Sequence, residues 1–142
     1  MDADGENQRP VIEGPAVDYG NDFYPDGKRI LTFSARDGGK FNAYEFEIAT
    51  RTFRELPVDL SDAISIRLSP DGKRIAYHSK RDSITINTWM ADLTTQTQQK
   101  LTFDREFIGY PCWSPDGKEL ALEVRRLSLI HISETHETVL DN

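Results

Sequence analysis

Pro25-Asp26-Gly27-Lys28 returns as Pro70-Asp71-Gly72-Lys73 and again as Pro115-Asp116-Gly117-Lys118, and each copy begins 45 residues after the one before. Proline sets the backbone for the first central position of a turn, and aspartate caps the turn with a side-chain oxygen. Glycine accepts the positive φ that closes a hairpin. Each copy therefore predicts a tight hairpin that joins two β-strands, with a structural role for its proline, aspartate and glycine.

The residues on both sides of the turns continue the repeat and predict strands. Alternating apolar residues follow each turn, beginning at Ile30, Ile75 and Leu120, as is typical of a strand. The first strand of each unit is expected to end at Phe23, Leu68 and Trp113, and third and fourth strands are marked by the pairs Tyr44 with Trp89 and Leu56 with Leu101. Four short antiparallel strands in about 45 residues, with no helical pattern, are the content of a β-propeller blade. The prediction is an all-β partial propeller, and a solenoid is the main structural rival.

The repeat also predicts the organisation of the chain into blades. The expected units are a remnant of a preceding blade at 1–12, a blade at 13–57, a second blade at 58–102, a truncated blade at 103–126, and a tail of different origin at 127–142. In the tail, the repeat calls for an aromatic and an aliphatic residue where Glu134 and Thr138 stand. The segment Leu127-Ser128-Leu129-Ile130-His131-Ile132-Ser133 looks like the translation of a transposon adapter used in sequencing libraries. The alternative is a native edge strand, and genomic DNA that continues in frame past the codon for Arg126 would support the alternative.

Two phrases carry a resemblance to a known family. Trp113-Ser114-Pro115-Asp116-Gly117-Lys118-Glu119-Leu120-Ala121 and Leu68-Ser69-Pro70-Asp71-Gly72-Lys73-Arg74-Ile75-Ala76-Tyr77, with the closing Lys100-Leu101-Thr102, resemble the WD-like repeat of the TolB propeller family. The resemblance runs from Met1 to Arg126. The first copy departs from the family pattern at Tyr24, where a serine is usual, and this predicts one hydrogen bond fewer in that turn.

The resemblance implies a protein-binding propeller in a bacterial envelope, hence a periplasmic or exported parent protein. The implied partners are proteins such as peptidoglycan-associated lipoprotein, and the implied role lies in envelope integrity or biopolymer transport. The family's small α/β domain ahead of the propeller has no counterpart in this sequence. Propellers of this type usually close with six blades, so the chain is expected to be an open arc that is marginally stable or self-associates through uncovered sheet edges.

Charge and composition exclude several classes of partner. The formal net charge is −7, which repels nucleic-acid phosphates and anionic membranes alike. No apolar run is long enough to span a bilayer. The single cysteine, Cys112, cannot form an internal disulfide, and its neighbours Pro111 and Trp113 suggest a small buried side chain.

The residues that could carry chemistry mostly favour structural roles. Ser69 and Ser114 open the turns and do not stand in Gly-x-Ser-x-Gly, so neither is expected to be a nucleophile. The recurring aspartates of the turns could form a cation site in principle, but they lie on separate blades and are expected to cap their own turns. His78 is expected to be packed in the second strand of its blade. His131 and His136 lack a third ligand.

No catalytic residue, cofactor site or metal site is predicted, and Asp37-Gly38-Gly39-Lys40 lacks the spacing of a phosphate-binding loop and reads as a hairpin. Arg36 and Arg81 occupy the same loop in successive blades, on a rim where propellers commonly place binding residues. They are the candidate contacts, and the alternative is that they are solvated loop charges.

Two functions remain open from the sequence. The first is a non-catalytic, TolB-like scaffold for protein–protein binding. The second is the propeller portion of a larger enzyme, such as a prolyl oligopeptidase-type serine hydrolase, whose catalytic domain is absent from this sequence. A parent gene that encodes Gly-x-Ser-x-Gly downstream of the blades would favour the second.

Overall fold

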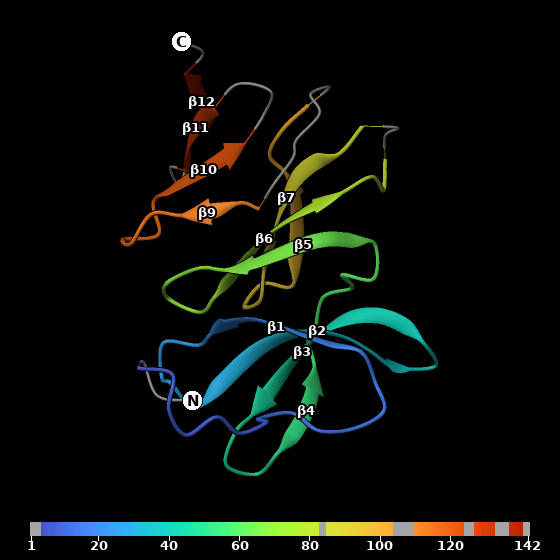
Figure 1. The fold of residues 1–142 in the computed structure, drawn as a ribbon. Helices are drawn as coiled ribbons and strands as arrows, with labels where there is room; N and C mark the ends of the chain where they lie inside the picture. Colours follow the sequence, from blue (N-terminus) through green and yellow to red (C-terminus); the bar gives the residue numbers. More distant parts are fainter. Residues whose placement is uncertain (1–3, 83–84, 104–109, 124–126, 133–136, 141–142) are drawn as a thin grey trace.

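The repeated turns lie between paired strands in three separate sheets (Figure 1). The computed structural model describes residues 4–82, 85–103, 110–123, 127–132 and 137–140, and for the last two ranges it describes the backbone alone. The sheets consist of β1 (Asp18–Phe23), β2 (Arg29–Asp37), β3 (Lys40–Glu47) and β4 (Thr52–Glu55); β5 (Ala63–Leu68), β6 (Arg74–Ser79), β7 (Asn87–Asp92) and β8 (Thr97–Lys100); and β9 (Cys112–Trp113), β10 (Glu119–Glu123), β11 (Leu127–Ile132) and β12 (Glu137–Leu140).

Each sheet is an antiparallel meander of four strands, which confirms the predicted all-β blade architecture. The first two strands of each sheet pair in the same register at the turn, as Phe23 with Ile30, Leu68 with Ile75 and Trp113 with Leu120. The described residues contain no helix, and so none that could cross a membrane.

The chemistry of the three turns is the same and explains the repeat. The glycine N–H donates to the carbonyl three residues earlier, at 2.9 Å in every copy. The glycine φ values are 65°, 74° and 71°, a left-handed conformation that other residues adopt only at a cost. The aspartate Oδ1 accepts the N–H of the following lysine at 2.8–3.1 Å. These hydrogen bonds and the left-handed glycines give all three turns the same closed geometry.

The first turn differs at Tyr24, as expected. In the second turn the hydroxyl of Ser69 donates to Asp71 at 2.6 Å and accepts the N–H of Arg74 at 2.9 Å, and the third turn repeats both bonds. Tyr24 forms neither of these bonds, because its phenol hydroxyl has no hydrogen-bond partner among the described residues. Instead, Arg29 Nε donates to the turn aspartate at 2.7 Å, and its guanidinium lies 4.4 Å from the centre of the Tyr24 ring.

The core lies between the first two sheets. Leu31 and Ala43 of the first sheet pack with Ile66, Ile75 and other buried residues of the second. A smaller cluster, which includes Leu101, Leu120 and Leu122, joins the second sheet to the third. The first strands lie side by side, β1 next to β5 and β5 next to β9 (Figure 1), so the sheets stack like propeller blades.

The turns themselves form a second joint between neighbouring sheets. A Cβ added to Gly72 would lie 2.9 Å from Pro25 Cδ, so the second turn rests directly on the first. The third turn approaches the second in the same way, because a Cβ added to Gly117 would lie 3.5 Å from Pro70 Cδ. Arg74 reinforces this second contact, because its Nη2 donates to the Gly117 carbonyl at 2.8 Å. The proline of one turn and the glycine of the next therefore form an inter-blade contact.

The third sheet continues past the predicted end of the third blade. The sequence places that end at residue 126, yet β11 and β12 extend the sheet, with Leu120 opposite Ile130 and Ile130 opposite Val139. Backbone pairing does not require the aromatic and aliphatic side chains that the repeat lacks in this segment, so strands form without them. The adapter origin of 127–142 stays a prediction. So does the blade remnant at 1–12, in whose described part, residues 4–12, no strand is found.

The prediction for Cys112 is wrong, because its side chain is exposed. Cys112 lies in β9, which has two residues and pairs only with β10, so it lies on an edge of the sheet. His78 is buried in β6, as expected.

Replacing Tyr24 by phenylalanine is expected to flatten the alkaline decline in stability. Burial raises the pKa of Tyr24 to about 12, against an unfolded value of about 10, with Glu45 as the next cause. The neutral phenol therefore stabilises the fold fully below about pH 10, and this contribution is lost as the pH rises towards 12. The Tyr24 hydroxyl has no hydrogen-bond partner among the described residues, so its removal costs little near neutral pH. Urea unfolding at several pH values measures how the free energy of unfolding falls between about pH 10 and 12. An equal fall in Tyr24→Phe and the unchanged chain would contradict the expectation.

Candidate functional site

The first strands β1 and β5 are edge strands, and each carries a bulge. Among the described strands, β1 pairs only with β2 and β5 only with β6, so within the described residues one backbone edge of each strand has no strand partner. Register shifts occur between Gly20 and Asp22 in β1, and between Ala63 and Ser65 in β5. Bulges re-aim side chains and are frequent next to binding sites. Here the two bulged strands lie next to each other.

A pocket of about 500 Å³ lies between these strands. Its described lining comes from the first two sheets and from the segment before β9: Tyr19, Gly20, Asn21, Phe33, Phe41, Ile64, Ser65, Ile66, Arg67 and Tyr110. We call this the inter-blade pocket. Its volume is in the range of small-molecule sites.

Three aromatic rings from the first sheet form one wall of the inter-blade pocket. Phe33 and Phe41 are stacked, with ring centres 5.3 Å apart and planes inclined by 19°. Tyr19 leans on Phe41 with 5.8 Å between ring centres. Such offset arrangements are favourable for aromatic pairs. The wall is therefore built from β1, β2 and β3 together.

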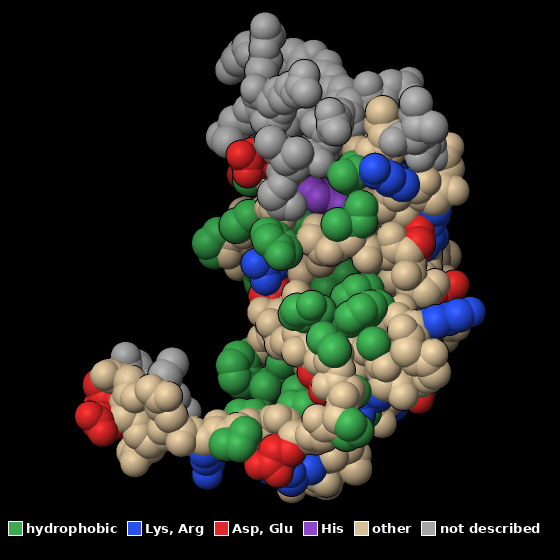
Figure 2. Space-filling view, turned by 45° about the vertical axis from the view of Figure 1, so that its right-hand side comes forward, with side chains coloured by type: hydrophobic (Ala, Val, Ile, Leu, Met, Phe, Trp, Pro, Cys, Tyr) green, Lys and Arg blue, Asp and Glu red, His purple; other side chains and the backbone are tan. Residues whose placement is uncertain are grey.

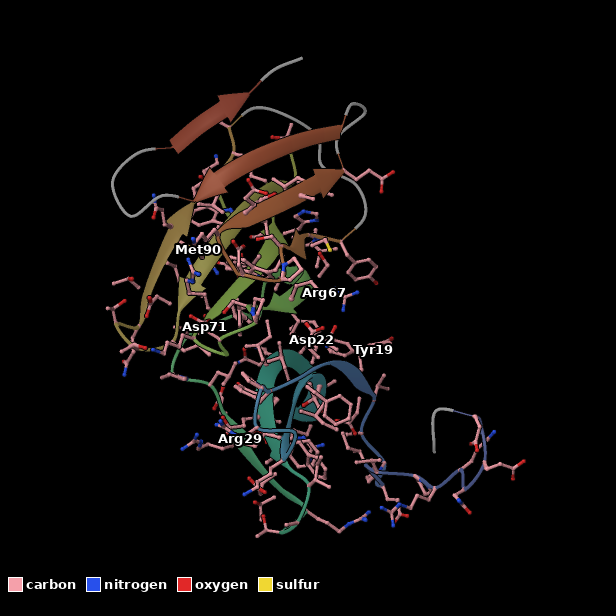
Figure 3. The ribbon with its side chains drawn as sticks, turned by 90° about the vertical axis from the view of Figure 1, so that its left-hand side faces the viewer. Tyr19, Asp22, Arg29, Arg67, Asp71 and Met90 are labelled. Atoms are coloured by element: carbon pink, nitrogen blue, oxygen red, sulfur yellow. The ribbon has the colours of Figure 1, made fainter. Side chains whose placement is uncertain are left out.

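Two polar side chains line the opposite part of the pocket, on β5. The guanidinium of Arg67 lies 3.6 Å from Asp22 Oδ1 and 4.8 Å from the centre of the Tyr110 ring. Figure 3 shows Tyr19, Asp22 and Arg67 close together where the first two sheets meet. Asp22 is fixed by its other oxygen, which accepts the N–H of Leu68 at 2.8 Å. The hydroxyl of Ser65 is buried and has no hydrogen-bond partner among the described residues.

Exposed apolar side chains lie on or next to the first strands, and three of the four described next also line the pocket. Tyr19, Phe23, Ile64 and Tyr110 are each more than half exposed, and we call this set the inner face. The chain curves like a crescent in Figure 2, with hydrophobic side chains along and beside its hollow side. Contiguous exposed apolar surface of this kind is typical of an interaction site.

The predicted contact residues Arg36 and Arg81 lie away from the inter-blade pocket and form intramolecular contacts. Arg36 Nη2 lies 2.8 Å from Asp18, and its guanidinium lies 3.1 Å from the centre of the Phe53 ring. Arg81 Nε donates to Asp62 at 2.7 Å, and its guanidinium lies about 5 Å from Trp89. Arg36 lies near the end of β2 and Arg81 lies just after β6, and each contacts an aspartate at or just before the first strand of its blade. These contacts favour a structural role, and a role in binding stays a prediction.

Arg81→Met is expected to lower the free energy of unfolding by about 1–2 kcal/mol, since it breaks charge-assisted hydrogen bonds that are only partly exposed. The Arg81 guanidinium holds the pKa of Asp62 below its usual value, with a further contribution from Ser79. This stabilisation is present above about pH 4 and is lost as the pH falls through the folded pKa. Lys80→Met, at an exposed neighbour, is the control and should change stability by less than about 0.5 kcal/mol in the same urea titration. Equal effects of the two variants would contradict the expectation.

The other residues singled out by sequence do not gather in one place. The turn aspartates accept hydrogen bonds within their own turns, and Ser69 and Ser114 cap those turns. Among the described side chains, which do not include those of His131 and His136, no three possible metal ligands lie together.

Sequence reasoning missed the pocket, although one signal was present. Asp22 and Arg67 stand 45 residues apart, at the same position of neighbouring blades, with opposite charges. First strands of neighbouring blades lie side by side, so opposite charges at one repeat position predict an inter-blade ion pair. The aromatic wall had no such signal, because Tyr19, Phe33 and Phe41 come from three different strands.

No protein-family model and no curated protein sequence matches this chain. Among solved structures it is similar to TolB from Acinetobacter baumannii, with 20% identity and a TM-score of 0.71 over 96% of this chain and 35% of that one. It is also similar to an oligogalacturonate lyase in complex with manganese, with 17% identity and a TM-score of 0.68 over 93% of this chain and 40% of that one. A third similar structure is dipeptidyl peptidase 4 from Porphyromonas gingivalis, with 16% identity and a TM-score of 0.61 over 87% of this chain and 19% of that one.

These structures include enzymes as well as TolB, and the chain spans well under half the length of each. At such low identity the likeness concerns the fold alone. The shared feature is a row of four-stranded antiparallel blades, which is also what the strand pairing gives. The chain therefore has the fold of an arc of β-propeller blades, similar in fold to those of TolB.

Proposed function

We propose that this chain is a non-catalytic propeller scaffold that binds a protein partner through its inner face. The observation that carries the proposal is the set of exposed apolar side chains on and beside the first strands, Tyr19, Phe23, Ile64 and Tyr110. Aromatic anchors with few charges form the centres of protein interfaces. The free edges of β1 and β5 add backbone groups with which an extended segment of a partner can pair.

The proposal places the parent protein in the bacterial periplasm, with an envelope protein as partner. It rests here on the TolB-like repeat and on the likeness in fold to TolB. The acidic net charge of −7 is consistent with a protein partner rather than nucleic acid.

A capture experiment tests the proposal. Ile64→Asp places a charge in the inner face at an exposed position and should abolish retention of an envelope protein that the unchanged chain retains from a bacterial envelope extract. Val11→Asp is the matched control, because Val11 is also exposed and apolar but lies outside the inner face. Retention that survives Ile64→Asp, or that Val11→Asp abolishes equally, would reject the inner face as the binding surface.

The second candidate is the propeller portion of a larger enzyme of the prolyl oligopeptidase type. It is favoured by the likeness in fold to dipeptidyl peptidase 4. The two candidates differ in the parent gene, because only the enzyme requires a Gly-x-Ser-x-Gly strand-turn-helix next to the blades. Sequencing the locus on both sides of this segment decides between them.

A further inference from the structure

We propose that the inter-blade pocket binds a small organic acid that carries a flat apolar ring and one carboxylate. This inference goes beyond the proposed function, because a protein partner would spread over the inner face, whereas a small acid occupies the pocket alone. The volume of about 500 Å³ is large enough for such a molecule.

The aromatic wall selects the ring. Phe33 and Phe41 are nearly parallel at 5.3 Å, and Tyr19 extends the surface beyond Phe41. Together they offer a broad apolar surface against which a planar group can pack. Ile64 and Ile66 supply aliphatic contacts from the side of β5.

The charge of the pocket selects the carboxylate. Arg67 is the only charged residue among the described lining residues, in a chain whose net charge is −7. A guanidinium can donate five hydrogen bonds in a planar fork that matches a carboxylate. An acid is therefore the complementary ligand, and a cation is not.

The donors of Arg67 are less occupied than those of Arg29 and Arg36. Its distance to Asp22 is 3.6 Å, whereas Arg29 and Arg36 each lie 2.8 Å from their carboxylates. Charge-assisted hydrogen bonds are usually 2.7–2.9 Å long, so the Asp22 contact is an ion pair without a direct hydrogen bond. The other carboxylate oxygen of Asp22 accepts the N–H of Leu68 at 2.8 Å, so Asp22 has a hydrogen bond that does not involve Arg67.

A second polar group supports a ligand in the same place. Ser65 is one of the lining residues, and its buried hydroxyl has no hydrogen-bond partner among the described residues. A buried hydroxyl without a partner destabilises a protein, and an acceptor on a ligand removes that cost. Ser65 and Arg67 stand two residues apart on β5, so they lie along one edge of the pocket.

The test uses a matched pair of probes with the full 142-residue chain. Indole-3-acetate has the ring and the carboxylate, and indole-3-acetamide has the same ring without the charge. Isothermal titration calorimetry should show saturable binding of the acid at one site per chain, and at least about tenfold weaker binding of the amide. Backbone amide shifts in nuclear magnetic resonance spectra should move at β1 and β5 on addition of the acid.

Arg67→Gln should weaken the acid at least about tenfold and leave the amide nearly unchanged, whereas Lys73→Gln, at an exposed lysine outside the pocket, should change neither. Phe41→Ala should weaken both probes. Equal affinity for acid and amide, no saturable binding at millimolar concentration, or shifts away from β1 and β5 would each overturn the proposal, and none of these three outcomes needs a variant. If the acid fails to bind while protein capture still depends on Ile64, the small-acid site is rejected and the protein-binding proposal stands.

Discussion

Gly72→Ala is expected to lower the free energy of unfolding by about 2–5 kcal/mol. The φ of Gly72 is 74°, and holding alanine in this left-handed conformation costs about 1–2 kcal/mol. The added Cβ would also lie 2.9 Å from Pro25 Cδ and 3.3 Å from Tyr24 Cδ1, distances at which the neighbouring turn must move. Forcing a group into a packed contact typically costs a further 1–3 kcal/mol or so.

Gly27→Ala is the matched control for this effect. Gly27 has the same place in its turn, with a φ of 65°, but no atom lies within 4 Å of the position of its added Cβ. It should therefore show the backbone cost alone, about 1–2 kcal/mol. Urea unfolding followed by tryptophan fluorescence measures both variants. If the two lose the same stability, the second turn does not rest on the first, and the stacking of turns is refuted.

The contact between turns explains why the repeated motif predicted the fold so well. Pro25, Asp26 and Gly27 determine their hairpin locally, so the sequence alone identifies the two strands that they join. The same proline also supports the glycine of the next turn, as Pro25 does for Gly72. A motif that forms both the hairpin and the joint between blades is informative about local and global structure at once.

The roles of Arg36 and Arg81 could not be predicted in this way. Each arginine pairs with an aspartate near the first strand of its own blade, Asp18 or Asp62. These aspartates stand 44 residues apart rather than 45, so they do not align in the repeat. The bulges in β1 and β5 lie at positions that are not equivalent either, and they change which residue faces the arginine. The sequence therefore showed two charges at one repeat position but not their partners, and it placed Arg36 in a loop although it lies in β2.

The inter-blade pocket was hidden for a different reason. Its aromatic wall and Arg67 come from different blades, so the site exists only after the sheets have stacked. Composition and periodicity describe each strand in turn, whereas the pocket depends on how two strands are placed side by side. Only the opposite charges of Asp22 and Arg67, at one repeat position of neighbouring blades, indicated a contact between the blades.

The packing between the first two sheets leads to the other large prediction. Leu31→Ala should lower the free energy of unfolding by about 2–5 kcal/mol, because Leu31 is fully buried in the core that both sheets share. Loss of this side chain leaves a cavity between rigid sheets, which can close only if the sheets move together. We expect a single cooperative transition at a lower urea concentration, because both sheets unfold as one unit. The dependence of the free energy of unfolding on urea concentration should not change.

Ile64→Ala is the control for Leu31→Ala, and it also bears on the site. Ile64 is 55% exposed on β5, so its truncation should change stability by less than about 0.5 kcal/mol. A small cost would mean that this apolar side chain is kept in water without benefit to the fold, as expected of a residue that serves binding. A cost as large as that of Leu31→Ala would instead place Ile64 in a packed core, and the inner face would then lose the residue on which its capture test depends. The two truncations together therefore separate the part of the apolar surface that holds the blades together from the part that is left for a partner.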